Sequence, residues 1–238
     1  MKVSVAHHQR SLKRVVYFLR VNNAKARKHI FLVRHGESEG NKADTYQQAD
    51  TPLTKTGFLQ ARAIAERIAH LTDIEAVVSS DMLRARQTAE RIAERVGAPH
   101  FVEGLFRERR RASFFVGKRR DDPAAQEADK RIRENFGVPG FRFDDEETYD
   151  DLVTRADEAL AWLAGREEGR MVVVSHGFFL RCLVGRALWG EHLSPHVLLR
   201  FVYGTRIFNT GLSELLCQEG EEFPWVLVTL NDRAHLGE

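Results

Sequence analysis

The chain has 238 residues, of which 43% are hydrophobic and 29% are charged. These values are close to the averages of globular proteins and exclude a fibrous or fully disordered chain, and the length suits a single α/β domain. No apolar run approaches the ~20 residues that a membrane span requires, and no segment is typical of a signal peptide.

The net charge of +2 is unevenly distributed along the chain. Residues 1–28 carry eight Lys or Arg and no acid, whereas the remainder carries 28 basic and 34 acidic residues. A basic arm can bind nucleic acid or anionic lipid, but a short charged terminus is more often only solvated. We therefore interpret 1–28 as a basic N-terminal extension, expect no catalytic role for residues 1–23, and place one domain in residues 29–238.

The two cysteines, Cys182 and Cys217, match no CxxC pattern and fall in segments that are expected to be buried. Free buried thiols suit a reducing compartment. Together with the absence of a signal peptide pattern, they favour a cytoplasmic protein without membrane contact.

From residue 29 onward, short apolar runs alternate with longer segments of helical spacing, which predicts βα units around a mostly parallel sheet. The expected fold class is a three-layer α/β/α sandwich. Residues 105–147 lack clear periodicity and are interpreted as an inserted lid. The expected strands are 29–33, 74–79, 100–103, 170–174, 213–217 and 225–230. The expected helices are 54–70, 81–96, 148–162 and 177–189.

Two expected strands end in the same dipeptide, His-Gly, at His35-Gly36 and at His176-Gly177. Glycine after each histidine lets the backbone and a ligand approach closely, as an oxyanion-binding turn requires. Open α/β sheets bind ligands beyond the carboxyl ends of their strands. A lone histidine there is usually structural, but two in matched settings, one of them preceded by Arg34, favour a binding site.

The segment around the first histidine resembles the RHGE signature of the histidine phosphatase superfamily, also called phosphoglycerate mutase-like. Further motifs of that family have counterparts in the same order, so the resemblance spans about residues 29–230. It implies a phosphoglycerate mutase-like fold over 29–238 and catalysis without a metal or other cofactor. The matching segments are Arg34-His35-Gly36-Glu37-Ser38 with Asn41, Pro52-Leu53-Thr54 with Gly57, Ser79-Ser80 through Arg84-Ala85-Arg86-Gln87-Thr88-Ala89, Val174-Ser175-His176-Gly177, and Asn209-Thr210-Gly211.

The resemblance also implies a role for each matching residue. His35 would attack phosphorus as a neutral imidazole and carry the phosphate as phosphohistidine. Arg34 and Arg84 would bind phosphate oxygens through planar guanidinium groups. His176 would be a protonated donor to the same oxygens. The phosphate-binding residues implied in this way are Arg34, Asn41, Arg84, His176 and Gly177.

The acid of the family is a glutamate in an Arg-Glu context, which is Glu108 in this chain. It would protonate the leaving group and then activate the water that hydrolyses the phosphohistidine. The competing carboxylate, Glu37, lies inside the His35 turn and is interpreted as structural. Directly after Glu108 the usual glycine-rich Trp-Glu-Gly stretch is replaced by Arg110-Arg111-Ala112-Ser113-Phe114-Phe115.

Three functions stay open at this point, of which we favour a phosphatase for a small phosphorylated metabolite or a phosphoprotein. The second is a phosphoglycerate-type mutase. Against it, Gly40 precedes Asn41 where mutases usually have Trp, and their Phe-Thr-Gly-Trp stretch is missing. The third is a catalytically idle domain that binds an anionic partner. The sequence indicates no oligomeric state.

Other chemistries receive less support from the sequence. Seven basic residues within 107–120, together with Phe114 and Phe115, could bind nucleic acid, but a basic lid over a phosphate pocket needs fewer assumptions. The acidic run 144–147 is interpreted as a solvated lead-in to the next helix. No G-x-S-x-G elbow surrounds Ser175 as a serine hydrolase would need, and no spacing is typical of metal ligands.

Overall fold

The computed structural model describes residues 27–71 and 73–237, so most of the predicted basic extension, residues 1–26, lies outside the described residues. The described strands form one six-stranded mixed sheet in the order β3-β2-β4-β1-β5-β6. Strands β1 to β4 pair in parallel, whereas β5 is antiparallel to both of its neighbours. The strands are β1 (Lys28–Arg34), β2 (Ala76–Ser79), β3 (His100–Val102), β4 (Arg170–Ser175), β5 (Leu212–Cys217) and β6 (Trp225–Asp232).

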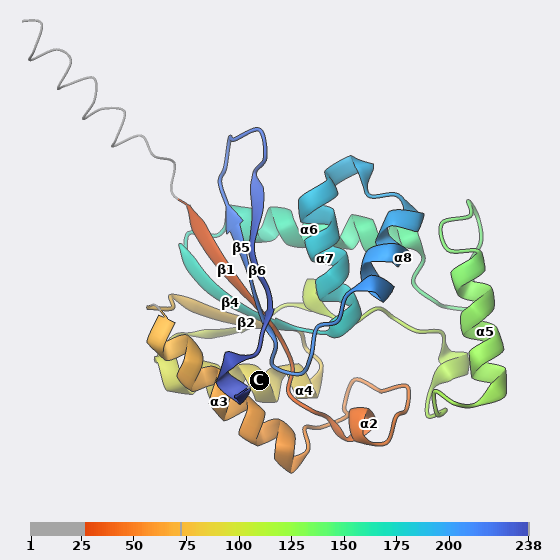
Figure 1. Ribbon diagram of the computed structural model, residues 1–238, viewed down its shortest axis with the longest axis horizontal. Coiled ribbons are helices and arrows are strands. Elements are labelled where there is room, and N and C mark those ends of the chain that lie inside the picture. Colours follow the sequence, from red (N-terminus) through yellow and green to blue (C-terminus); the bar gives the residue numbers. More distant parts are fainter. Residues whose placement is uncertain (1–26, 72, 238) are drawn as a thin grey trace, which may run out of the picture.

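Helices cover both faces of this sheet, as Figure 1 shows, and the predicted three-layer sandwich is confirmed. Helices α6, α7 and α8 lie on one face, and α3 and α4 lie on the other. Within the described ranges, no helix is long and apolar enough to cross a bilayer. The helices are α2 (Glu39–Lys42), α3 (Lys55–Leu71), α4 (Leu83–Val96), α5 (Pro123–Glu134), α6 (Tyr149–Gly165), α7 (Gly177–Trp189) and α8 (Pro195–Gly204).

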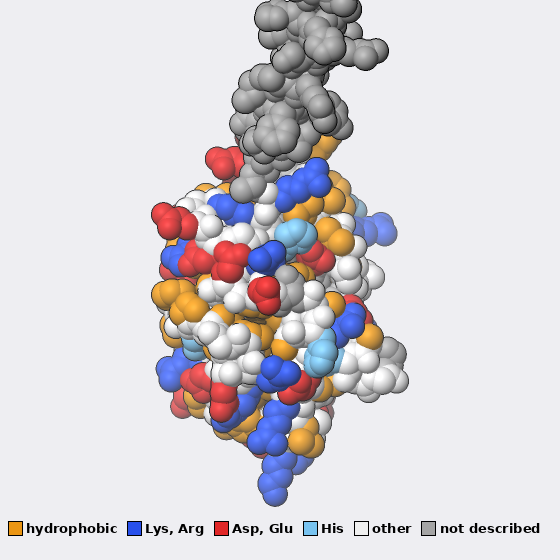
Figure 2. All heavy atoms as spheres, turned by 90° about the vertical axis from the view of Figure 1, so that its left-hand side faces the viewer, with side chains coloured by type: hydrophobic (Ala, Val, Ile, Leu, Met, Phe, Trp, Pro, Cys, Tyr) orange, Lys and Arg blue, Asp and Glu red, His pale blue; other side chains and the backbone are white. Residues whose placement is uncertain are grey.

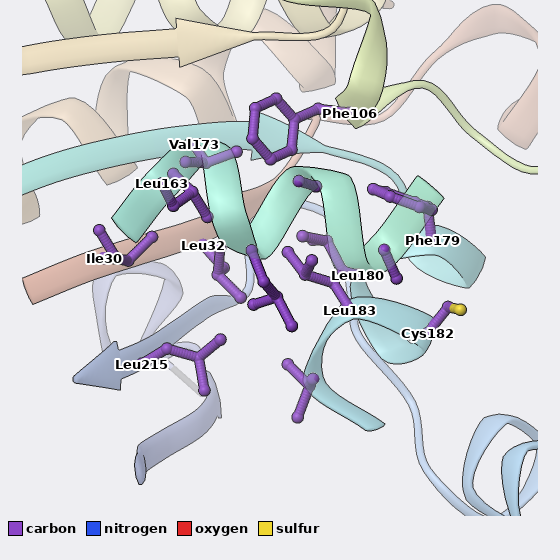
Figure 3. Close-up of a cluster of buried hydrophobic side chains, with 14 of the residues drawn as sticks. Ile30, Leu32, Phe106, Leu163, Val173, Phe179, Leu180, Cys182, Leu183 and Leu215 are labelled. Carbon is purple, nitrogen blue, oxygen red and sulfur yellow. The ribbon is translucent and has the colours of Figure 1, made fainter. Parts of the chain in front are cut away.

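The alternation of side chains along the strands divides the core into two clusters. In β1, Ile30 and Leu32 face α6 and α7, whereas Phe31 and Val33 face α3 and α4. Figure 3 shows the first cluster, in which aliphatic and aromatic side chains from the sheet and from α6 and α7 interdigitate. Because successive side chains of a strand point to opposite faces, the central strands are apolar on both sides.

Helices α5 and α8 were not predicted, nor was the four-residue helix α2. The starts of α5 and α8 had local signals. Each begins with a capping residue followed by proline, a pair that favours the start of a helix. The Asp122 carboxylate accepts from the Ala125 N–H at 2.8 Å, and Ser194 caps α8 in the same way. The segment interpreted as an irregular lid therefore contains a regular helix of 12 residues.

The lid has a small core of its own, built from Phe115 and the apolar face of α5. Tyr46, which follows the turn after β1, packs against this core, and its N–H donates to the Lys118 carbonyl at 3.0 Å. The lid is thereby fastened beside the carboxyl end of β1, on the side where Figure 1 places α2 and α5.

The acidic run 144–147 before α6 is solvated only in its first half, so that interpretation was wrong for Glu146 and Glu147. Glu146 is 3% exposed and Glu147 is 7% exposed. Both carboxylates can be buried because each meets an arginine from another segment, Arg109 for Glu146 and Arg155 of α6 for Glu147. A buried charge is tolerated only when it is paired in this way.

Among the described residues, the surface on the side from which β1 starts carries side chains of every type, with several Lys and Arg side chains at its lower end in Figure 2. Figure 2 shows acidic, basic and apolar side chains interspersed over that face.

Both cysteines, Cys182 and Cys217, are buried and free, as predicted.

Candidate active site

The register of the two central strands brings the two His-Gly turns together. Arg34 of β1 lies opposite Ser175 of β4 in the parallel ladder, and the His35 N–H donates to the Ser175 carbonyl at 3.0 Å. The next residue on each strand is a histidine. As a result, the imidazole centroids of His35 and His176 are 5.1 Å apart, and the two residues are 2% and 0% exposed.

The hydrogen bonds of His35 define its tautomer. Its Nδ1 lies 2.7 Å from the Gly36 carbonyl oxygen, which can only accept, so Nδ1 carries the proton. The other ring nitrogen, Nε2, accepts from Arg84 Nε at 3.3 Å. Burial, followed by the charges of Arg84 and Arg34, holds the pKa of His35 well below its usual value. His35 is therefore a neutral imidazole with its lone pair on Nε2.

His176 is oriented by Ser80, which directly follows β2 at the same edge of the sheet. The Ser80 hydroxyl lies 2.7 Å from Nε2 of His176 and accepts from the Met82 N–H at 3.3 Å. When the hydroxyl donates to Nε2, the proton of the ring resides on Nδ1. That nitrogen is buried and has no hydrogen-bond partner among the described residues. Burial and the charge of Arg84 also hold the pKa of His176 well below its usual value.

Two arginines complete the cationic wall around His35. Arg84, in the first turn of α4, is 3% exposed and is fixed by donating to the Gln48 carbonyl at 2.9 Å. Arg34 donates from Nη1 to the Ile207 carbonyl at 2.7 Å, whereas its Nε is buried without a partner in the described part of the chain. Burial lowers the pKa of each guanidinium to about 10, partly offset by the nearby carboxylate of Glu108. Both remain charged near neutrality.

Gly177 and Asn41 leave donors free beside the arginines. A Cβ on Gly177 would come within 3.4 Å of Arg34 Nε, so glycine keeps the space beside that guanidinium open. The side-chain oxygen of Asn41 accepts from Ser38 and from Asn209 Nδ2. Its amide nitrogen is therefore the part of Asn41 that can donate to a ligand.

Glu108 lies against the first turn of α7. One carboxylate oxygen accepts from the Phe179 N–H at 2.9 Å and from the Arg109 N–H at 2.9 Å, and the other accepts from the Phe178 N–H at 3.2 Å. A helix N-terminus favours a carboxylate in this position. Glu37, in contrast, accepts from the Thr54 hydroxyl at 2.7 Å and joins its turn to the start of α3.

All of the sequence-predicted site residues gather at one end of the sheet. Asn209, quoted above only as part of a motif, donates to the His35 carbonyl at 2.9 Å. Ser80 was missed as a site residue, although its place at the end of a strand was a usable signal. The Ser175 hydroxyl donates to the Phe106 carbonyl at 2.7 Å and is fully buried, so it is unsuited to act as a nucleophile.

Within residues 27–71 and 73–237, no three His, Cys, Asp or Glu side chains are grouped so as to hold a metal ion. The described residues place the neutral imidazole of His35 among the buried hydrogen-bond donors of Arg34, Arg84 and His176. Such an arrangement suits the equatorial oxygens of a phosphoryl group in transfer.

Comparison with known proteins gives a consistent family. The model of the histidine phosphatase superfamily (branch 1) matches residues 30–233. The probable phosphoglycerate mutase GpmB of Photorhabdus laumondii is 36% identical over 212 residues, which cover 87% of this chain and 94% of the relative. The Escherichia coli O139:H28 protein of the same name is 33% identical over 217 residues, with the same coverage.

Solved structures with the same fold include several phosphatases. Mycobacterial glucosyl-3-phosphoglycerate phosphatase superposes with a TM-score of 0.69 at 25% identity and covers 87% of this chain and 100% of its own. A putative α-ribazole-5'-P phosphatase from Escherichia coli has a TM-score of 0.71 at 21% identity, covering 87% of this chain and 97% of its own.

Proposed function

The chain belongs to the histidine phosphatase superfamily, and from this premise we propose that it is a phosphatase that hydrolyses a small phosphomonoester through a phosphohistidine on His35. One observation carries the proposal. Arg34 and His176 lie beside His35, and each has a buried nitrogen, Nε of Arg34 and Nδ1 of His176, without a partner in the described part of the protein. Leaving a buried donor unpaired is costly, and a phosphate oxygen would satisfy both.

In the first step, Nε2 of His35 attacks phosphorus and the bond to the ester oxygen breaks. Negative charge on the three equatorial oxygens is stabilised by Arg34, Arg84 and the amide of Asn41. The low pKa of His176 makes it neutral in the free protein. A phosphate dianion would raise that pKa and favour the protonated donor.

The leaving alkoxide takes a proton from Glu108, which thereby becomes a carboxylate. In the second step the same carboxylate removes a proton from water as the water attacks the phosphohistidine. The P–N bond breaks, inorganic phosphate is released, and both His35 and Glu108 return to their starting forms. The closeness of Glu108 to Arg34 and Arg84 supports this role, because these arginines would hold the phosphate whose leaving group takes the proton. The negative charge of the bound phosphate would offset the arginines and the helix N-terminus and favour the protonated carboxyl.

The mutase alternative has support in the names of the GpmB relatives. The turn after His35 favours hydrolysis instead. A Cβ on Gly40 would lie 2.2 Å from a side-chain carbon of Gln47, and the Gln47 amide oxygen accepts from the Ser38 hydroxyl at 2.7 Å. The tryptophan that mutases usually have in place of Gly40 would displace Gln47. Glucosyl-3-phosphoglycerate and α-ribazole-5'-P, named for two fold relatives, are sensible first substrates.

The decisive experiment traps the phosphoenzyme. Wild type and His35→Ala are incubated in chelator with an aryl phosphate, phosphorylated metabolites and phosphopeptides, and then quenched to detect acid-labile phosphate on the protein. We expect the wild type to release inorganic phosphate from a metabolite and His35→Ala to form neither phosphoenzyme nor product.

Each other outcome points to a different function. Turnover by His35→Ala equal to that of the wild type would falsify the nucleophile assignment. Transfer of phosphate between hydroxyls of phosphoglycerate, without release, would identify a mutase. A wild type that forms no phosphoenzyme with any compound would be the idle binding domain.

A further inference from the structure

Among the described residues, the Glu108 carboxylate has no cationic side chain as a hydrogen-bond partner. Its partners are backbone N–H groups of two segments, Arg109 on one side and Phe178 and Phe179 on the other. The position of the acid over the phosphate pocket thus depends on how the segment around Glu108 is held against the first turn of α7.

The Arg109 side chain bridges these two segments. Its guanidinium carbon lies 4.7 Å from the ring centroid of Phe178 in α7 and 5.5 Å from that of Phe136 after α5. The Arg109 side chain is 3% exposed. A desolvated guanidinium over an aromatic face is strongly attracted to it, so Arg109 joins the acid's own backbone to the helix turn that binds its carboxylate.

The charge of Arg109 is balanced by the buried carboxylate of Glu146. Arg109 Nη2 and Glu146 Oε1 are 2.8 Å apart, and the second oxygen of Glu146 accepts from the Ala112 N–H at 2.7 Å. Arg111 Nε lies 3.2 Å from the same Oε1. Burial raises the pKa of Glu146 and lowers that of Arg109, and each charge opposes the shift of the other.

The adjacent Glu147 holds the same stretch of chain from the other direction. Arg155 donates to both of its oxygens, at 2.7 and 2.8 Å, and also to the carbonyls of Leu105 and Arg107 at 2.8 and 2.9 Å. Two consecutive glutamates therefore fix residues 105–112 on both sides of Glu108. We call residues 105–112 the acid segment.

We propose that Arg109 and Glu146 are positioning residues for catalysis, a buried ion pair that sets the Glu108 carboxyl against α7 in reach of the leaving group. The proposal rests on the proposed function, in which Glu108 is the acid. In this role the pair binds neither the substrate nor its phosphate. It acts through the backbone, and Glu146 also accepts from Ala112 in the stretch that replaces the glycine-rich Trp-Glu-Gly stretch of the family.

The test uses the dependence of turnover on the leaving group. An aryl phosphate departs readily without a proton, whereas an alkyl phosphate needs general acid catalysis, which typically contributes about 10²- to 10⁴-fold. The variant is Arg109→Met/Glu146→Gln in the full chain. It removes both charges together, which usually destabilises a protein far less than removing one partner of a buried ion pair. For that reason Glu146→Gln is not used as a single substitution. The introduced amide oxygen can still accept from Ala112.

We expect this double variant to lose roughly tenfold or more of its kcat on the alkyl ester and less than about threefold on the aryl ester. The matched control is Arg107→Gln, on the other side of Glu108, whose ion pair with Asp81 is exposed. That control should keep both rates within about twofold of wild type, because an exposed pair contributes little.

A second arm shows whether the pair works through the acid. Added to Glu108→Gln, the double change should cause no further loss on the alkyl ester, since residues that act through one group are not additive. Thermal unfolding monitors the fold of each variant. If the double variant fails to fold, Arg109→Lys, which keeps the charge but not the planar stacking, gives the same two readings.

Equal losses on both esters, or a full additional loss in the Glu108→Gln background, would overturn the positioning role and leave a purely structural pair. A wild type that hydrolyses neither ester would refute the proposed function, and the inference with it. The two failures are therefore distinguishable.

Discussion

The proposed phosphate pocket, formed by Arg34, His35, Arg84 and His176, and the acid segment lie side by side but are held in place by different interactions. His35 and His176 are set by the register of β1 and β4 and by backbone hydrogen bonds. Glu108 accepts from backbone N–H groups of two segments, and in the proposal above a buried ion pair and a cation–π contact join these segments. Backbone ladders tolerate most substitutions, whereas a buried ion pair fails when one partner is lost. We therefore expect the arrangement of the pocket to survive most substitutions around it, and the position of Glu108 to change when one partner of an ion pair is replaced.

The largest effect should distinguish an arginine of the pocket wall from an exposed arginine of the same helix. Arg84→Ala should lower kcat on an aryl phosphate by about 10²-fold or more, because it removes a fixed donor to the transferring oxygens. The matched control is Arg86→Ala, on the exposed side of the same helix, which should change kcat by less than about twofold. Steady-state rates of the two variants decide the matter, and a loss below about fivefold for Arg84→Ala would place it outside the pocket.

A second experiment measures what burying the pocket histidines costs. The pKa of His35 and of His176 is held well below 6.5 in the folded protein. Below pH 6.5 the unfolded chain therefore binds protons there that the folded protein does not. The free energy of unfolding should fall as pH drops below 6.5, by up to about 1.4 kcal/mol per pH unit for each histidine.

Urea unfolding from pH 8 to pH 5 measures this slope. A His35→Gln/His176→Gln variant should show a flatter pH dependence than wild type, since neither site then titrates. Identical slopes would mean that the two imidazoles titrate alike in the folded and unfolded protein. Burial of the two histidines would then not lower the free energy of unfolding at acidic pH.

The smallest effect on turnover is expected from the core of the lid. Phe115 is fully buried there, and Phe115→Ala should weaken that core by about 3–5 kcal/mol. Because the lid core is separate from the clusters around the sheet, hydrogen exchange should accelerate within 105–147 but not in β1 or β4. Turnover of the aryl ester should fall by less than about threefold.

The neighbouring Phe114, which is 38% exposed, supplies the control. Phe114→Ala should leave exchange in the lid close to that of wild type. Accelerated exchange of the β1 amides in Phe115→Ala would contradict the comparison, because it would show that the pocket and the lid unfold as one unit.

The sheet and most of its helices were predictable because their signals are local. The alternation of apolar runs and helical spacing predicted every strand of the described sheet, with ends that differ by only a few residues. One boundary moved for a physical reason. Lys28, the last residue of the predicted extension, is already paired with Cys217 in the sheet. The unpredicted helices α5 and α8 each begin with a proline, Pro123 or Pro195, which is a recognisable signal for a helix start. Their amphipathic faces are short, so the helical spacing was missed.

The acidic run before α6 was misread for a different reason. Four acidic residues in a row are usually solvated, and nothing local distinguishes Glu146 and Glu147 from Asp144 and Asp145. Their arginine partners are 37 residues upstream for Glu146 and eight residues downstream for Glu147. Only the packing of the lid against α6 and α7 reveals which carboxylates are buried.

The sequence by itself determined which segments are strands, where the two His-Gly turns follow them, and the family to which the chain belongs. Parallel strands align their carboxyl ends whatever lies between them, so a motif at each end suffices to predict a shared pocket. The tertiary structure alone decided the tautomer of His35, the contact of Ser80 with His176, and the ion pairs around Glu108. These depend on side chains from separate elements meeting within hydrogen-bond distance, which no local pattern encodes.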